Sequence, residues 1–118
     1  MESKGDLDWR EAMRLAPDPY NAAGDRWVGS LPAGVSWTQL DDRLIARGWY
    51  PKSAVARLRV YGQGPGHEIV IEPSSRQVVF RITCATGTTA EACASVVEQL
   101  AEVLAEEAGL LPPKQRAA

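Results

Sequence analysis

The second half of the chain contains three short runs in which apolar and polar positions alternate. They cover residues 55–61, 68–72 and 77–84, and a period of two residues is typical of a strand with one buried side. The positions predicted to face the core are Ala56, Leu58, Val60, Ile69, Ile71, Val78, Phe80, Ile82 and Cys84. The outer side carries Val55, Arg57, Arg59, Tyr61, Glu68, Val70, Glu72, Val79 and Arg81.

Turn sequences separate these runs. Residues 62–66 read Gly-Gln-Gly-Pro-Gly, and residues 73–75 read Pro-Ser-Ser. Short connections between neighbouring strands predict an antiparallel meander. Keeping every apolar position on one face places Glu68 opposite Arg81 and, in one allowed register, opposite Arg59. Each such exposed ion pair contributes only ~0.2–1 kcal/mol, so these pairs would fix the register more than they would hold the fold.

A long amphipathic helix is predicted after the third run. It begins at Thr88 or Thr89, where Thr88-x-x-Glu91 matches a capping box, and Gly109 with the prolines that follow ends it. Apolar residues recur at three- and four-residue steps along it, which predicts burial of one side. The other side is acidic, and no Lys or Arg occurs over residues 86–113. Its acidic positions are Glu91, Glu98, Glu102 and Glu106.

The first half of the chain predicts a second helix and an irregular arm. Ser36-x-x-Gln39 is another capping box, and Gly48 ends a helix whose apolar positions are Trp37, Leu40, Leu44 and Ile45. A short helix is expected within residues 7–15. Residues 17–35 read as irregular because Pro and Gly interrupt them, yet they hold Trp27 and other anchors that either pack on the domain or wait for a partner.

Together these elements predict an α+β fold. We expect a two-layer sandwich with the order helix, three-stranded antiparallel meander and long helix, with both helices on one face of the sheet. The predicted organisation is an N-terminal arm over residues 1–35, the α-β-β-β-α domain over residues 36–111, and a C-terminal tail over residues 112–118. At 118 residues the chain has the length of one domain.

Composition narrows the classes of function. The chain is 45% hydrophobic and 24% charged with a net charge of −2, which is typical of a globular protein and opposes a general phosphate-binding surface. No run is long enough for a transmembrane helix, and the first residues lack the apolar stretch of a signal peptide, so we expect a cytoplasmic protein. In that compartment Cys84 and Cys93 are expected to be reduced core thiols, although a disulfide between them is geometrically conceivable.

No stretch carries a catalytic, metal or cofactor signature. His67 is the only histidine, and its position at the start of a strand favours a structural role over a functional one. The glycines of residues 62–66 precede a strand and not a helix, so they lack the helix N-terminus that phosphate loops use. We therefore expect no catalytic residues, no metal ion and no cofactor.

The outer face of the predicted sheet is the most informative surface. Its three valines make it more apolar than a solvated face requires, so either the N-terminal arm or a second chain is expected to cover it, unless it simply faces water. The residues predicted to bind a protein are Val55, Arg57, Arg59, Tyr61, Val70, Val79 and Arg81, with Trp9 and Trp27 as aromatic anchors. Self-association through the sheet face or edge is compatible with this prediction.

Two family resemblances accompany the predicted order of elements. Residues 36–111 resemble the double-stranded-RNA-binding domain, and Gly64-Pro65-Gly66-His67 matches its loop between the first two strands. The resemblance implies a minor-groove contact by His67, but the lysine cluster of that family is missing at residues 88–92. The segment Leu40-x-x-x-Leu44-x-x-x-Gly48-Trp49 is similar to the opening helix of HicA-type toxins, and Gly66-His67 to their G-S-H strand, without its serine.

The leading prediction is a non-enzymatic, protein-binding module of the immunity, antitoxin, inhibitor or adaptor type. It would use the outer sheet face and the acidic helix. The alternative is a double-stranded-RNA-binding or HicA-like RNA-cleaving protein that uses His67 with Arg57, Arg59 and Arg81. One continuous basic patch with His67 would favour RNA, and arginines neutralised by Glu68 and Glu72 would favour a protein partner. No membrane partner is expected.

Overall fold

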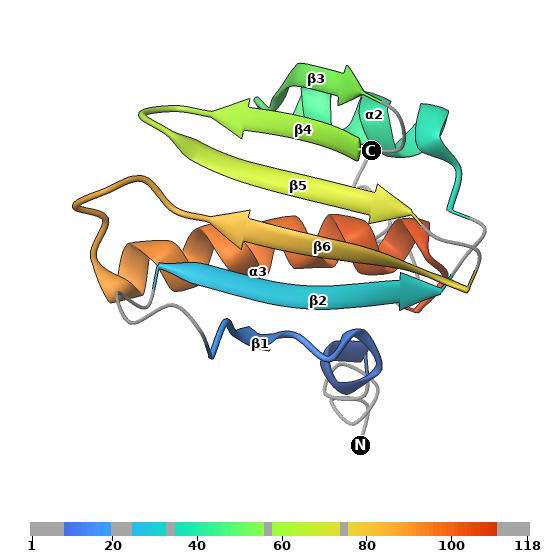
Figure 1. Cartoon of the computed structure of the whole chain (residues 1–118), viewed down its shortest axis with the longest axis horizontal. Coiled ribbons are helices and arrows are strands. Elements are labelled where there is room, and N and C mark those ends of the chain that lie inside the picture. Colours follow the sequence, from blue (N-terminus) through green and yellow to red (C-terminus); the bar gives the residue numbers. More distant parts are fainter. Residues whose placement is uncertain (1–8, 20–24, 33–34, 56–57, 74–75, 111–118) are drawn as a thin grey trace, which may run out of the picture.

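A six-stranded antiparallel sheet covered by helices on one face forms the fold (Figure 1). The computed structural model describes residues 9–19, 25–32, 35–55, 58–73 and 76–110. The strands are β1 (Ala16–Pro17), β2 (Arg26–Pro32), β3 (Tyr50–Val55), β4 (Leu58–Gln63), β5 (His67–Pro73) and β6 (Gln77–Thr83), in the spatial order β1-β2-β6-β5-β4-β3. The helices are α2 (Trp37–Ala46) and α3 (Ala90–Glu107), and residues 9–13 are also helical. The predicted α+β class with an antiparallel sheet is confirmed, but the sheet has six strands and not three.

Strand β2 is the largest departure from the prediction. Residues 26–32 pair with β6 along its whole length, from Arg26 opposite Thr83 to Pro32 opposite Gln77. The expected irregular course of this segment is therefore wrong. Gly29 has a packing role there, because the ring of Phe80 lies directly over it and occupies the space that a side chain would need. The half-buried Trp27 also packs against the core, so this anchor joins the domain.

The predicted first strand is in fact a hairpin. Residues 55–61 do not form one strand, because β3 ends at Val55, β4 begins at Leu58, and these two residues lie opposite each other. The faces are consequently reversed from the prediction. Tyr61 is 2% exposed in the core, whereas Leu58 is 38% exposed. Arg57 and Ala56 lie outside the described residues, and of Val55 only the backbone is described.

The faces of β5 and β6 are as predicted, but the register is not. Ile69, Ile71, Phe80 and Ile82 are all buried, and Val79 and Arg81 are exposed. The register differs from the expected one by two residues, with Ile69 opposite Ile82 and Glu68 opposite Thr83. On the other side, Glu68 faces Gly62. The expected position of Glu68 between Arg59 and Arg81 is therefore wrong, and Lys52 of β3 binds its carboxylate at 3.0 Å instead.

Both long helices begin and end at predicted residues. The hydroxyl of Ser36 accepts from the Gln39 amide, and that of Thr89 accepts from the Ala92 amide. Gly48 and Gly109 follow the helices with positive φ angles of 91° and 78°, a conformation that glycine adopts at little cost. At each end the next amide returns to the helix, Trp49 to Leu44 and Leu110 to Ala105, both at 2.9 Å. These are Schellman motifs, which satisfy the last carbonyls of a helix.

The core lies between the sheet and the helices. Ile69, Ile71, Phe80 and Ile82 from the sheet meet the buried residues of the helices and of the helical residues 9–13. The helix side contributes Trp9, Met13, Leu40, Leu44, Cys93, Val97, Leu100, Ala101, Val103, Leu104 and Ala105. Ile45, expected in the core, is instead 48% exposed, and the side chain of Trp37 lies outside the described residues.

A disulfide joins Cys84, just after β6, to Cys93 in the first turns of α3. Their Cα atoms are 5.9 Å apart, and each residue is 2% exposed. The expectation of two reduced thiols is therefore wrong. The inward positions that the sequence pattern gave these cysteines are also the positions that bring the end of a strand next to the start of the covering helix.

Both edges of the sheet are poorly suited to strand pairing. At one edge, β3 contains Pro51 and Lys52, and its register shifts between Pro51 and Ser53 as in a β-bulge. At the other edge, β1 has only two residues, one of them Pro17. Proline, lysine, bulges and short strands are the features that prevent a sheet edge from pairing with another chain.

Candidate functional site

The face of the sheet opposite the helices is the candidate functional site, and we call it the open face. Its members follow from the strand registers and exposure: Arg26, Val28 and Ser30 on β2, Leu58 and Val60 on β4, Glu68, Val70 and Glu72 on β5, and Val79 and Arg81 on β6. No element of the described residues covers this face (Figure 1). Val79 is 42% exposed, although most strand positions with valine are buried.

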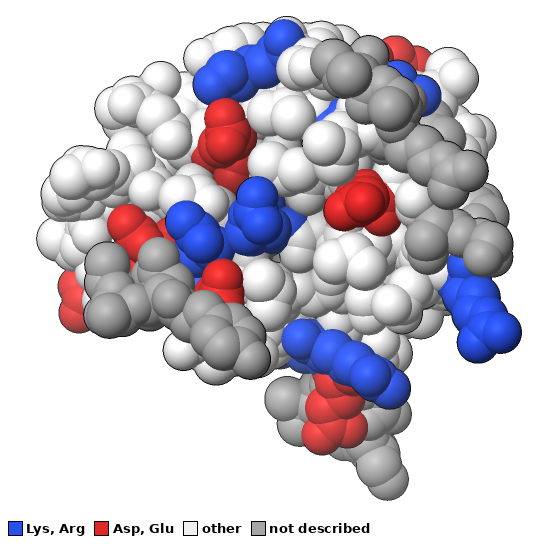
Figure 2. All heavy atoms as spheres, viewed as in Figure 1, with Lys and Arg blue, Asp and Glu red and all other residues white. Residues whose placement is uncertain are grey.

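The open face combines apolar surface with charges of both signs. Figure 2 shows acidic and basic residues dispersed over this face with uncharged surface between them. Arg81 is exposed in the row Val60–Val70–Arg81–Val28, and Glu72 is exposed next to Val79. Uncharged area interrupted by charged residues is typical of a surface that binds another protein.

Of the predicted binding residues, Val70, Val79 and Arg81 lie on this face. Trp9 and Tyr61 are in the core, 3% and 2% exposed, and therefore offer no surface to a partner. Trp27 faces the core side of β2, opposite Ile82. The apolar residues of this face that the predicted binding set lacks are Val28, Leu58 and Val60. No strong local signal marks Val28, because Gly29 interrupts the alternation of residues 26–31.

Arg59 and Tyr61 line a cleft on the other side of the sheet. The cleft has a volume of about 490 Å³ and lies between α2 and the strands β3 and β4; Thr38, Asp41, Pro51, Lys52, Ser53, Arg59 and Tyr61 line it. The hydroxyl of Tyr61 donates to Oδ1 of Asp41 at 2.7 Å. Burial and this hydrogen bond raise the pKa of Tyr61 well above its usual range, so that the hydroxyl keeps its proton at neutral pH.

The expected acidic surface of α3 is largely paired. Arg10 forms an ion pair with Glu98, and Arg43 of α2 contacts both Glu106 and Glu107. The side chain of Glu106 is only 3% exposed, so it does not lie on the solvent side as predicted. These arginines anchor the other helices to α3, and the glutamates therefore contribute to packing more than to a free acidic face.

His67 has a structural contact in the place where the sequence pattern put it. Its Nδ1 accepts the backbone N–H of Ala85 at 3.0 Å, so the ring holds the start of β5 to the residue that follows Cys84. Because Nδ1 accepts this hydrogen bond, the proton of the ring is on Nε2. Arg59 lies in the cleft and Arg81 on the open face, so these two residues and His67 do not form one continuous basic patch.

Metal and membrane sites find no support in the described residues. No three His, Cys, Asp or Glu side chains gather there as potential metal ligands. No helix in this part of the chain is long and apolar enough to cross a membrane. Comparison with family models, curated proteins and solved structures finds no match. The resemblances to double-stranded-RNA-binding domains and HicA-type toxins therefore stay predictions.

Proposed function

We propose that this chain is a non-enzymatic protein-binding module, of the immunity, antitoxin, inhibitor or adaptor type, that binds its partner through the open face. One observation carries the proposal: the described helices are all on one side of the sheet, and the other side presents valines and Leu58 to the surroundings. An apolar sheet face that nothing covers is costly in water, and contact with another protein removes that cost.

The size of the open face sets the kind of complex. Strands spaced by ~4.8 Å and rising ~3.3 Å per residue give four central strands a face of roughly 15 by 20 Å. This is below the ~800 Å² that each partner buries in a standard interface. The face alone thus supports a transient complex, and a tight complex would need additional contacts around it.

The two edges favour the face over strand addition. Pro51, Lys52 and the bulge at β3, and the short β1 with Pro17, oppose pairing with an incoming strand. Side chains, and not backbone hydrogen bonds, would therefore select the partner. Because the face carries Arg81 and Glu72 together, a partner with both signs of charge fits better than a purely basic or purely acidic one.

The test uses two variants of exposed apolar residues. Val79→Lys adds a charge to the open face, whereas Ile45→Lys adds the same charge to a similarly exposed residue on α2. Neither change enters the core, so both variants should fold, which circular dichroism checks. Tagged wild-type and variant proteins are used to capture partners from nuclease-treated lysate of the source cells, with identification by mass spectrometry.

A discrete protein retained by wild type and Ile45→Lys but lost with Val79→Lys supports the proposal. A direct titration of that purified partner should show at least a tenfold weaker Kd for Val79→Lys, about 1.4 kcal/mol. Capture that Val79→Lys leaves unchanged, or that depends on RNA, would contradict it. Light scattering on the purified chain tests the homodimer separately, because a dimer through this face would dissociate in Val79→Lys.

A further inference from the structure

The charged residues of the open face fall into two groups, and the first group is already paired within the chain. The carboxylate of Glu68 binds the ammonium group of Lys52 at 3.0 Å. On β2, the guanidinium of Arg26 lies 3.7 Å from the carboxylate of Asp18. A partner that used either charge would first have to compete with these contacts, so the first group contributes little to recognition.

Glu72 and Arg81 form the second group. Both are exposed, and neither forms an ion pair with a residue in the described part of the chain. Glu72 of β5 is opposite Val79 of β6. Two positions earlier on β5, Val70 is opposite Arg81. Alternate residues of a strand point to the same face, so these four residues are the corners of one quadrilateral on the open face. We call them the quartet.

The quartet is complementary to itself. One of its diagonals joins the two valines, and the other joins the opposite charges of Glu72 and Arg81. A two-fold axis along the valine diagonal, between two facing sheets, places each valine against the same valine of a second copy. The same rotation brings Arg81 of each copy to Glu72 of the other. The contact then contains two pairs of opposite charges and no pair of like charges, whereas a partner of one sign would satisfy only one of the two residues.

The dimensions of a sheet allow this contact and predict its strength. With strands ~4.8 Å apart and alternate residues ~6.7 Å apart, rotation about the valine diagonal makes the strands of the two copies cross at roughly 70°. This angle is near the orthogonal class of sheet packing, in which side chains of the two faces interdigitate. Because the open face is smaller than the ~800 Å² that each partner buries in a standard interface, the dimer is expected to be weak.

We propose that the partner of the open face is a second copy of this chain, docked about a two-fold axis along the Val70–Val79 diagonal with Arg81 of each copy against Glu72 of the other. The inference rests on the proposed role of the open face as a protein-binding surface, and it names the occupant of that surface. The purified chain should therefore dimerise with a Kd between about 10 µM and 1 mM.

The test is sedimentation equilibrium of the full chain and of two charge-reversal variants, up to about 2 mM protein. Glu72→Arg and Arg81→Glu each place like charges opposite one another in the two-fold contact, so each variant alone should dimerise at least tenfold more weakly than wild type. An equimolar mixture should recover the wild-type Kd within about threefold, because the copy with two arginines in the quartet then meets the copy with two glutamates. Circular dichroism checks that each variant is folded.

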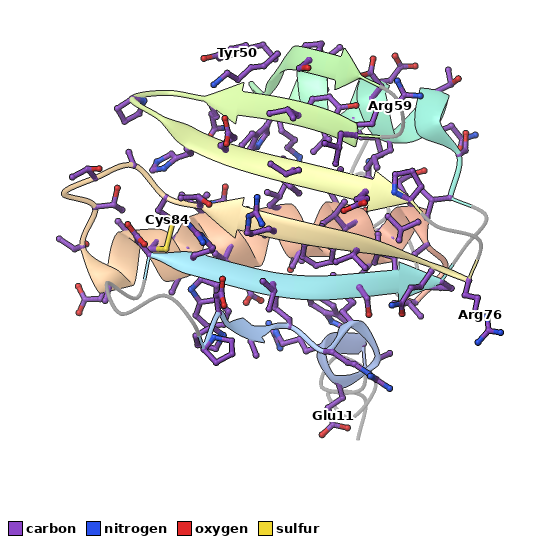
Figure 3. All side chains as sticks on the ribbon, viewed as in Figure 1. Glu11, Tyr50, Arg59, Arg76 and Cys84 are labelled. Carbon is purple, nitrogen blue, oxygen red and sulfur yellow. A yellow bond between two sulfur atoms is a disulfide. The ribbon has the colours of Figure 1, made fainter. Side chains whose placement is uncertain are left out.

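Glu11→Arg is the matched control. Figure 3 shows Glu11 projecting away from the sheet, from the helical residues 9–13, and the residue is exposed. Its reversal changes the net charge as much as Glu72→Arg does, but it should leave the Kd of the dimer unchanged. A mixture of Glu11→Arg with Arg81→Glu should not recover dimerisation, which separates the quartet contact from a general attraction between oppositely changed chains.

A wild-type chain that stays monomeric up to about 2 mM would overturn the inference. A mixture of Glu72→Arg and Arg81→Glu that dimerises no better than either variant alone would overturn it as well. Capture of a different protein that is lost with Val79→Lys, together with a monomeric purified chain, would remove this inference and leave the proposed function intact. A dimer that Val79→Lys does not weaken would place the contact outside the open face and contradict the inference, while the capture experiment would still test the proposed function.

Discussion

Reduction of the Cys84–Cys93 disulfide tests how the sheet is fastened to its covering helix. The bond closes a short loop, because the cysteines are nine residues apart in the sequence. A cross-link stabilises mainly by limiting the unfolded chain, with an entropy of about −2.1 − 1.5R ln n cal/mol/K for a loop of n residues. For n of about nine this gives roughly 2.6 kcal/mol at 25 °C. That is a large fraction of the 5–15 kcal/mol that is typical for a whole domain.

The assay is urea denaturation of the oxidised chain, the reduced chain and a Cys84→Ala/Cys93→Ala variant. The reduced chain should unfold at a midpoint about 1–2 M lower in urea, since the slope of the free energy is roughly 1–3 kcal/mol/M for small domains. Both cysteines are buried, so the reductant must act during transient opening, and long incubation is needed. The variant serves as the control, because its midpoint should not respond to the reductant.

Equal midpoints for the oxidised and reduced chains would refute the reasoning. Free thiols found in the chain purified from its own cells would show that the bond is not formed there. The cytoplasmic location stays a prediction, and the disulfide counts against it because such bonds persist chiefly in oxidising compartments.

Three further changes test the packing. Gly29→Ala should destabilise the fold by about 1–3 kcal/mol in urea denaturation, because the new methyl group would occupy the space of the Phe80 ring. Arg43→Ala should cost about 2–4 kcal/mol in the same assay, since it leaves the buried Glu106 carboxylate without its partner. Tyr61→Phe should cost about 0.5–1.5 kcal/mol near neutral pH and should flatten the loss of stability above about pH 10. The folded-state pKa of Tyr61 is raised, so its contribution is complete below the unfolded-state pKa and is lost as the pH rises through the folded-state value.

Each of these changes has its own control. Replacing Phe80 by Leu in the Gly29→Ala background should recover part of the loss, as contacting residues do not act additively. Arg47→Ala, at the exposed residue that follows the same helix, should change the free energy of unfolding by less than about 0.5 kcal/mol. Tyr50→Phe, at a tyrosine that is 52% exposed, should leave the loss of stability above about pH 10 unchanged. A Tyr61→Phe profile that parallels wild type above pH 10 would contradict the assignment.

The accuracy of the sequence-based fold prediction depended on how local the signals were. Strands β5 and β6 and both helices have clear periodicity, and their caps are local contacts of Ser36, Thr89, Gly48 and Gly109, so they could be predicted. Strand β2 could not, because Gly29 and Pro32 resemble loop residues, and the reason for Gly29 is its contact with Phe80, 51 positions away.

The hairpin of β3 and β4 was missed for a different reason. The sequence that joins β3 to β4 is Ala56-Arg57, without the Gly, Asn or Asp that usually marks a two-residue connection, so the alternation continued unbroken through it. Merging the two strands reversed the predicted faces and placed Tyr61 and Arg59 on the outer side. Arg59 and Tyr61 were therefore assigned to the wrong side because the break between the two strands was not recognised, while Val70, Val79 and Arg81 on β5 and β6 lie on the predicted side.

The two edge strands β1 and β3, which are poorly suited to pairing, also have a consequence for the behaviour of the chain at high concentration. Fibrils grow when an exposed strand offers its backbone to another copy in a repeating register. One edge of this sheet has Pro51 and a bulge, and the other is a two-residue strand with Pro17. Neither edge offers a regular strand with which another copy could pair. The open face can thus remain accessible while neither edge of the sheet favours repeated pairing between copies of the chain.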